Sequence, residues 1–193
     1  MKKLTLFTTA LAFTAFIFTQ ATAQDTNTAA HNVVIGIPEV ALLDIESSSG
    51  TSINLTPAAP TEAGSPISFA STTNTALWIN YSSIVGATTE PTRKVTTSIT
   101  TGTVPSGMLL KVQAAADAAQ GDGTVGTPVG QLTLSGTAQD FVTGIGSCYT
   151  GTGVSKGHQL TYTLLLNPTA GNYANLNFDQ ATTVTVTYTL TNN

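Results

Sequence analysis

The sequence predicts an all-β protein, folded as one two-sheet β-sandwich of about ten short strands. Stretches in which apolar and polar residues alternate recur along the chain, and clusters of Gly, Pro, Asn and Ser divide them. The clearest stretch is Thr182–Leu190, in which Val184, Val186, Tyr188 and Leu190 share one face and threonines occupy the other. Since no amphipathic helical period runs beyond two turns, nothing competes with a β fold.

The first expected strands lie on either side of a proline. Val33, Ile35 and Ile37 alternate with polar or small neighbours, and an apolar run follows at Val40–Ile45. Pro38 cannot donate to a ladder, so we expect two strand pieces with a kink between them. Next come a turn at Glu46–Gly50, a short strand at Ile53 and Leu55, a loop at Thr56–Ser65 and a strand that begins at Ile67.

A strand over Ala76–Ser82 carries the single tryptophan. Leu77, Ile79 and Tyr81 fall on one face, and Trp78 falls on the other with Asn80. A core tryptophan packed on the opposite sheet is the ordinary expectation. The alternative is an exposed platform on which a sugar stacks.

The remaining strands follow the same alternation. We expect them at Val95–Ile99, Met108–Ala114, Leu132–Leu134, Phe141–Ile145, Leu160–Leu166 and Thr182–Leu190. The stretches Ala115–Thr127 and Gly144–Gly157 are rich in glycine and are predicted to be loops, the first with one helical turn at its alanine-rich start. Asp117 and Asp122 lie in the first of these loops but lack EF-hand spacing.

The N-terminus has the features of a secretory signal peptide. Lys2 and Lys3 precede the apolar stretch Leu4–Phe18, and Ala21 and Ala23 form a small-x-small cleavage site. We therefore expect residues 1–23 to be removed and residues 24–193 to form a single domain. The apolar stretch is shorter than the roughly 20 residues of a membrane-spanning helix, so the mature form is expected to be exported without membrane insertion.

Charge and cysteine content limit the partners and the source of stability. Removal of two lysines changes the net charge from −4 to −6, which disfavours nucleic acid and anionic membranes. The only cysteine is Cys148, so stability must come from the core instead of an internal disulfide. A buried inert thiol is the plain interpretation, and an intermolecular bridge or a reactive thiol is the alternative.

No motif in the sequence supports catalysis, a metal or a cofactor. Gly153–Gly157 matches the text pattern of a nucleophile elbow, but a strand follows it where that motif needs a helix. His31 and His158 are far apart and have no cysteine or carboxylate at ligand spacing. Phosphate-binding glycines between a strand and a helix are also missing. We therefore expect a protein without catalytic residues.

Three segments together give the chain a family resemblance. They are Val33–Ile37, the turn and strand Val104–Val112, and the closing stretch Tyr173–Leu190. In these segments the chain resembles pilin-like β-sandwich secreted proteins, the group that includes chaperone-usher fimbrial subunits and spore-coat-U-like proteins. The resemblance implies an immunoglobulin-like or pilin-like sandwich that is exported and lacks catalytic residues.

The leading hypothesis is a non-enzymatic, exported structural or adhesive subunit at the surface of a bacterium, for example in a fimbria-like filament. Its partners would be copies of itself or other surface subunits. The candidate residues for strand exchange are Val33, Ile35, Ile37, Val184, Val186, Tyr188 and Leu190, because both stretches are uncharged and lack the usual protection of a sheet edge. The alternative function is a secreted carbohydrate-binding module that uses Trp78, Tyr81 or Tyr149.

Overall fold

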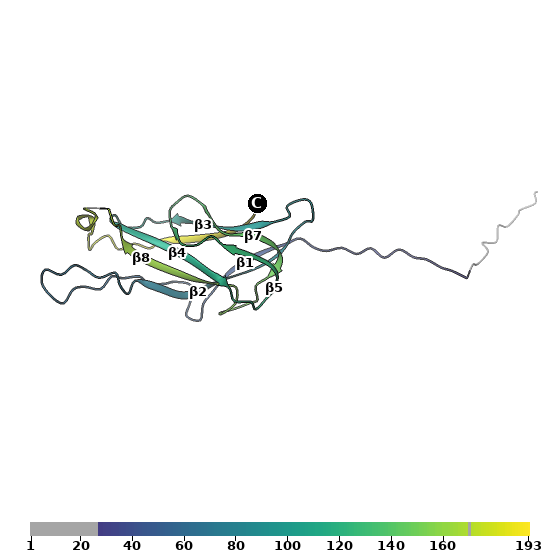
Figure 1. Cartoon of the computed structure of the whole chain (residues 1–193), viewed down its shortest axis with the longest axis horizontal. Coiled ribbons are helices and arrows are strands. Elements are labelled where there is room, and N and C mark those ends of the chain that lie inside the picture. Colours follow the sequence, from purple (N-terminus) through teal and green to yellow (C-terminus); the bar gives the residue numbers. More distant parts are fainter. Residues whose placement is uncertain (1–26, 170) are drawn as a thin grey trace, which may run out of the picture. The chain divides into compact units, whose positions relative to one another are not determined.

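The computed structural model describes residues 27–169 and 171–193, and the chain divides into two units, Met1–Gly36 and Ile37–Asn193. Residues 27–36 of the first unit contain no strand or helix. The second unit holds the strands β1 (Val40–Glu46), β2 (Thr73–Ile84), β3 (Arg93–Thr101), β4 (Met108–Asp117), β5 (Asp122–Pro128), β6 (Leu132–Thr133), β7 (Gln139–Tyr149), β8 (His158–Leu166) and β9 (Thr185–Asn192), with one short 3₁₀ helix, η1 (Asn172–Asn175) (Figure 1).

The prediction of an all-β chain is confirmed. All of these strands belong to one antiparallel sheet in the order β6-β4-β8-β2-β7-β3-β9, with β1 added to β2 and β5 added to β7. The finer prediction, a two-sheet sandwich of immunoglobulin or pilin type, stays a prediction.

A short ladder joins the two halves of this sheet. β2 pairs with β8 from Thr73 to Ile79, and pairs with β7 only at Ser82 and Ser83. The groups β1-β2-β8-β4-β6 and β5-β7-β3-β9 therefore meet through two residues of β2. Their side chains meet again between strands that are not ladder neighbours, because the hydroxyl of Tyr162 on β8 lies 2.7 Å from that of Tyr188 on β9.

The core is built from the alternate residues that the sequence predicted. Leu77, Ile79 and Tyr81 of β2 are buried, and Trp78 is only partly buried on the other face. The fully buried apolar residues from the remaining strands are Val95, Val112, Phe141, Val142, Ile145 and Leu160. Period-two alternation thus identifies most of the buried apolar residues, but not the adjacent pair Phe141 and Val142 or the buried Asn80.

Several predicted elements near the N-terminus are wrong. Val33–Ile37 and the stretch around Ile53 and Leu55 form no strand, and between them only β1 is present. The strand that was predicted to start at Ile67 is also missing, and a single isolated bridge joins Ala58 and Ser68 there. Alternation gives a strand only when a neighbouring edge is available to pair with it.

The predicted loop Ala115–Thr127 is also wrong, since β4 continues to Asp117 and β5 begins at Asp122. Its glycines permit a close approach of two strands. A Cβ on Gly123 would lie 2.2 Å from the Ser147 carbonyl oxygen of β7, and the residue has a φ of +90°. Glycine in this strand therefore marks a tight contact between backbones.

The other differences concern where elements begin and end. β7 extends to Tyr149, so the first part of the predicted glycine-rich loop Gly144–Gly157 is strand. The closing strand runs over Thr185–Asn192, three residues later at its start than predicted. The predicted signal peptide, residues 1–23, lies outside the described residues.

A buried arginine fixes the start of β1. Arg93 of β3 is only 2% exposed, and its guanidinium donates to the Val40 carbonyl oxygen and forms an ion pair with Glu39. Its Nε also donates to Oδ1 of Asn192 on β9, at 2.9 Å. The residues that lead into β1 are therefore held to β3, and through Arg93 to β9.

Candidate functional site

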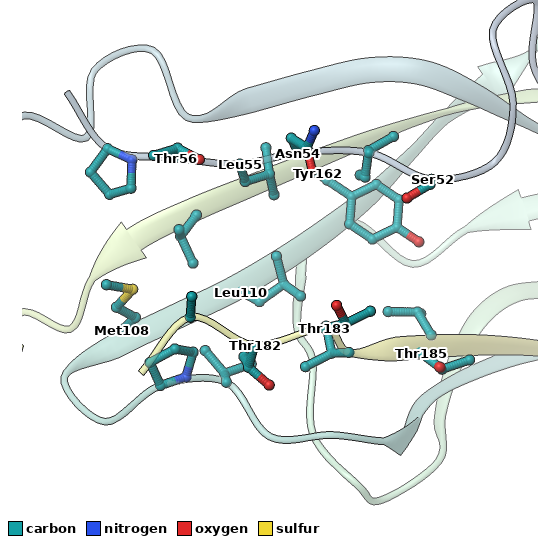
Figure 2. A pocket seen from close by; sticks show the side chains of 18 of the residues that line it. Ser52, Asn54, Leu55, Thr56, Met108, Leu110, Tyr162, Thr182, Thr183 and Thr185 are labelled. Atoms are coloured by element: carbon teal, nitrogen blue, oxygen red, sulfur yellow. The ribbon is translucent and has the colours of Figure 1, made fainter. Parts of the chain in front are cut away.

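A groove of about 1250 Å³ lies between two segments outside the regular ladders. One wall is Thr51–Pro57, after β1, and the other runs from Asn177 to the start of β9. Figure 2 shows Ser52 to Thr56 on one side and Thr182 to Thr185 on the other, with Leu110 and Tyr162 between them. Ordinary ligand sites have volumes of about 300–1,000 Å³, so this groove exceeds what a small molecule needs.

The floor of the groove is part of the apolar core. Leu77 of β2, Leu110 of β4 and the pair Tyr162 and Leu164 of β8 all line it. These four side chains are 5 to 8% exposed, whereas the fully buried core residues of β3 and β7 are 0% exposed. The core residues of β3 and β7 are thus fully covered, whereas the four core residues along the groove are slightly exposed.

The walls combine half-buried apolar residues with free backbone. Ile53, Leu55, Val184 and Val186 are partly buried and pack on the core from the two walls. Within the described residues β9 pairs with β3 alone, so its second edge is open. A row of unpaired N–H and C=O groups on such an edge can accept another strand.

Two tyrosines, Tyr162 of β8 and Tyr188 of β9, close the inner part of the groove. Their hydroxyl oxygens lie 2.7 Å apart, and the ring of Tyr188 packs on Phe141 with a centroid separation of 5.2 Å. Burial raises the pKa of Tyr162 to about 12. Burial also raises the pKa of Tyr188, by more than it raises that of Tyr162. Both side chains are therefore neutral hydroxyls at physiological pH and carry no charge into the groove.

The candidate residues for strand exchange occupy two different environments. Val33, Ile35 and Ile37 are 70%, 86% and 80% exposed and belong to no strand. The residues at the other end of the chain are half-buried, and three of them, Val184, Val186 and Tyr188, line the groove, whereas Leu190 lies further along β9. The structure therefore has exposed apolar residues at Val33–Ile37 and half-buried apolar residues in the groove wall near the C-terminus.

The three aromatic residues of the carbohydrate hypothesis do not form one surface. Tyr81 is 3% exposed, so it cannot serve as an exposed stacking residue and that part of the hypothesis is wrong. Its hydroxyl donates to the Val125 carbonyl oxygen and lies 2.7 Å from Nε2 of His158. Tyr149 is 53% exposed, and Trp78 is partly exposed.

His158 is held inside the core and away from the serine of the glycine-rich motif. The histidine is 0% exposed, and its Nδ1 lies 2.8 Å from the Ala115 carbonyl oxygen. Among the described residues, neither ring nitrogen is hydrogen-bonded to Ser155. His158 therefore does not serve as a hydrogen-bonded base for Ser155 in this structure.

Cys148 is a free thiol with 7% exposure, as the plain interpretation of the sequence expects. Burial raises its pKa to about 11, and the charge of Asp117 adds to the effect. In residues 27–169 and 171–193, no cluster of three or more His, Cys, Asp or Glu side chains could hold a metal ion. No helix in that part of the chain is long and apolar enough to cross a membrane.

Comparisons of this chain with protein-family models, with curated proteins and with solved structures found no match. The pilin-like resemblance therefore rests on the residues of this chain alone.

Sequence reasoning missed the first wall of the groove and its floor. Ile53 and Leu55 alternate, and that signal predicted a strand instead of an uncovered wall. Leu110 and Leu164 lie in strands that were predicted, but alternation cannot show which part of a core lies next to an open edge. The position of that opening depends on which strands pair.

Proposed function

We propose that this protein is a non-enzymatic, exported structural or adhesive subunit of a bacterial surface assembly, joined to other copies by strand addition. In this proposal, Val33–Ile37 of one copy lies in the groove of the next copy and pairs with the open edge of β9. The observation that carries the proposal is the coexistence of an open apolar groove and an exposed, strand-patterned apolar segment in one chain.

The donor segment has the pattern that the groove requires. Val33, Ile35 and Ile37 would point to one side of an extended segment, and Val34 would point to the other. Side chains of the first set could fill the space above Leu110 and Leu164, while the backbone completes hydrogen bonds with β9. The five extended residues of the donor span about 16 Å.

Burial of the donor gives a reason for association. Three large aliphatic side chains, now 70 to 86% exposed, would leave water. Full burial of one such side chain contributes roughly 1.5–3 kcal/mol, and part of this gain is lost to ordering of the segment. The neutral hydroxyls of Tyr162 and Tyr188 impose no charge-burial penalty.

Deletion of residues 25–37 tests the proposal. Because β1 starts at Val40 and Arg93 anchors it, we expect the deletion variant to remain folded and to be unable to form oligomers. Sedimentation analysis and circular dichroism measure the two properties. An unfolded product would instead assign Val33–Ile37 to the core of its own subunit.

Two point variants supply a matched pair within the donor segment. Ile35→Asp places a charge on the side that would enter the groove and should abolish assembly, whereas Val34→Asp places the same charge on the opposite side and should have a much smaller effect. Equal loss of assembly in both variants would argue against an ordered strand in the groove.

A crosslink locates the contact. The double variant Ile35→Cys and Val184→Cys should form disulfide-linked ladders under mild oxidation if the donor lies along the wall before β9. Each single variant serves as a control, and buried Cys148 should contribute little because it is 7% exposed.

A further inference from the structure

The open edge nearest in sequence to the donor segment is that of β1 in its own subunit. Within the described residues β1 pairs with β2 alone, so its second edge has no ladder partner. Only Pro38 and Glu39 separate the donor segment from Val40, the first residue of β1. A strand-patterned segment so close to an open edge is well placed to fold back on it as a β-hairpin. Val33–Ile37 nevertheless belongs to no strand, and this has a physical reason.

A fold-back on β1 would take the donor segment out of assembly. With Pro38 and Glu39 as a two-residue turn, alternate residues of the segment would stand opposite alternate residues of β1. The opposed pairs would be Ile37 and Val40, Gly36 and Ala41, Ile35 and Leu42, and Val33 and Asp44. Of these β1 residues only Asp44 lines the groove, so the segment would lie mostly outside it. A subunit in this state could not donate its strand to another copy.

Pro38 excludes the turns that this hairpin needs. Two-residue hairpins favour type I′ and type II′ turns, and both require a positive φ at the first turn residue. The proline ring fixes φ at about −65°. In a type I′ turn Glu39 would also need a positive φ, which residues other than glycine rarely adopt. The sequence between the donor segment and β1 therefore opposes the fold-back.

Arg93 opposes the same hairpin from the folded subunit. Its guanidinium donates to the Val40 carbonyl oxygen and forms an ion pair with Glu39. A two-residue hairpin would close with the Ile37 N–H donating to that same carbonyl oxygen. The arginine is 2% exposed, and its Nε donates to Oδ1 of Asn192 at 2.9 Å, so β9 helps to hold it in place. The closing hydrogen bond would thus have to compete with a buried guanidinium.

We propose that Pro38, Glu39 and Arg93 determine specificity by keeping the donor segment from pairing with β1 of its own subunit. The segment then stays available for the groove of a second copy. This inference rests on the proposed strand addition. It adds that the choice between the subunit itself and a second copy is made by the two residues that lead into β1 and by one buried side chain.

A favourable turn tests this proposal. The double variant Pro38→Asn and Glu39→Gly, here called the turn variant, has the residues that a type I′ turn prefers and lacks the ion pair with Arg93. Added Gly36→Cys and Ala41→Cys substitutions report the fold-back. Their Cα atoms would be about 4.5 Å apart in the hairpin, within the range of a disulfide. Both positions have room, since nothing lies within 4 Å of a Cβ on Gly36 and Ala41 is exposed.

The two turns should give opposite results at low protein concentration. With the original turn we expect no disulfide within one chain, and with the turn variant we expect a disulfide-linked monomer. If the donor is folded back nine-tenths of the time, roughly one subunit in ten is competent, so assembly should weaken about tenfold. Electrophoresis without reductant measures the crosslink. Sedimentation of the same proteins without the added cysteines measures assembly.

Two further variants separate the turn from the ion pair. Glu39→Gln removes the charge but keeps Pro38, so it should assemble like the original protein. Pro38→Gly keeps Glu39 and permits a type II′ turn, so it should form part of the crosslink even if the turn variant does not fold, which circular dichroism reports.

The crosslink and the assembly can fail separately. Equal crosslinking with both turns, no crosslink in any folded variant that lacks Pro38, or full assembly of a folded-back variant would overturn this inference and leave strand addition standing. An original protein that never assembles would overturn strand addition, and this inference with it.

Discussion

The groove and the region around Tyr81 bury tyrosine hydroxyls in opposite ways. The Tyr81 hydroxyl donates to the Val125 carbonyl oxygen and contacts His158, among strands that close on one another through the β2–β7 ladder. The hydroxyls of Tyr162 and Tyr188 contact each other beside an open cavity of about 1250 Å³. In the first region the hydroxyl has one backbone and one side-chain partner from the subunit itself, and the second region leaves room and an unpaired strand edge beside its hydroxyls.

This difference indicates where the proposed partner segment would bind. Ile79, Ile145 and Leu160 are 0% exposed near Tyr81, so nothing further can be buried there. Along the groove, Leu55 and Val184 are only half-buried, and the edge of β9 is unpaired in the described residues. The same sheet therefore has one region that is fully buried within the subunit and one that leaves an unpaired edge for the proposed partner segment.

The largest expected effect that tests this comparison is alkaline unfolding. The pKa of each of Tyr81, Tyr162 and Tyr188 is raised by burial above the value near 10 of an exposed tyrosine. Above pH 10 the unfolded chain loses these protons while the folded chain keeps them, so the free energy of unfolding falls as the pH rises. Each tyrosine contributes roughly 1.4 kcal/mol per pH unit, and below pH 10 none contributes.

Urea unfolding between pH 9 and pH 12 measures this slope. Tyr162→Phe removes one titrating hydroxyl, and it should make the slope shallower by roughly 1.4 kcal/mol per pH unit up to its folded-state pKa of about 12. A free energy of unfolding that stayed constant from pH 9 to pH 12 would contradict the burial of these tyrosines.

The second effect compares the truncation of a fully buried ring with that of a half-buried side chain in the groove wall. Phe141→Ala removes a fully buried ring that packs on Tyr188, and it should lower the free energy of unfolding by roughly 3–5 kcal/mol. Leu55→Ala removes a half-buried side chain from the groove wall and should cost about 1 kcal/mol or less in the isolated subunit. Chemical denaturation measures both values, and similar losses would contradict an open groove.

The smallest effect concerns a single hydroxyl. Tyr81→Phe removes the hydroxyl partner of the Val125 carbonyl oxygen and of Nε2 of His158, and it should cost roughly 1–3 kcal/mol. The matched variant Tyr149→Phe removes the same atom from an exposed ring and should change stability by less than about 0.5 kcal/mol. Equal effects of the two variants on the thermal midpoint would show that the Tyr81 hydroxyl is not held by the interior.

The sequence by itself determined which faces of the strands are buried. In β2, the alternation predicts that Leu77, Ile79 and Tyr81 are buried and that Trp78 is less so, because a strand projects successive side chains to opposite sides, but it does not predict the burial of Asn80. The same period predicts the exposed threonines and half-buried Val186 of β9. These properties are local, since they depend only on residues within one strand.

The tertiary structure decided which alternating segments become strands and where the core stays open. Val33–Ile37 alternates as β9 does, yet only β9 has a ladder partner, the edge of β3. Trp78 and Tyr149 share a face only because Ser82 of β2 pairs with Tyr149 of β7. Pairing joins residues that are far apart in sequence, and its free energy depends on the available edges and on the packing across them, neither of which a local pattern contains.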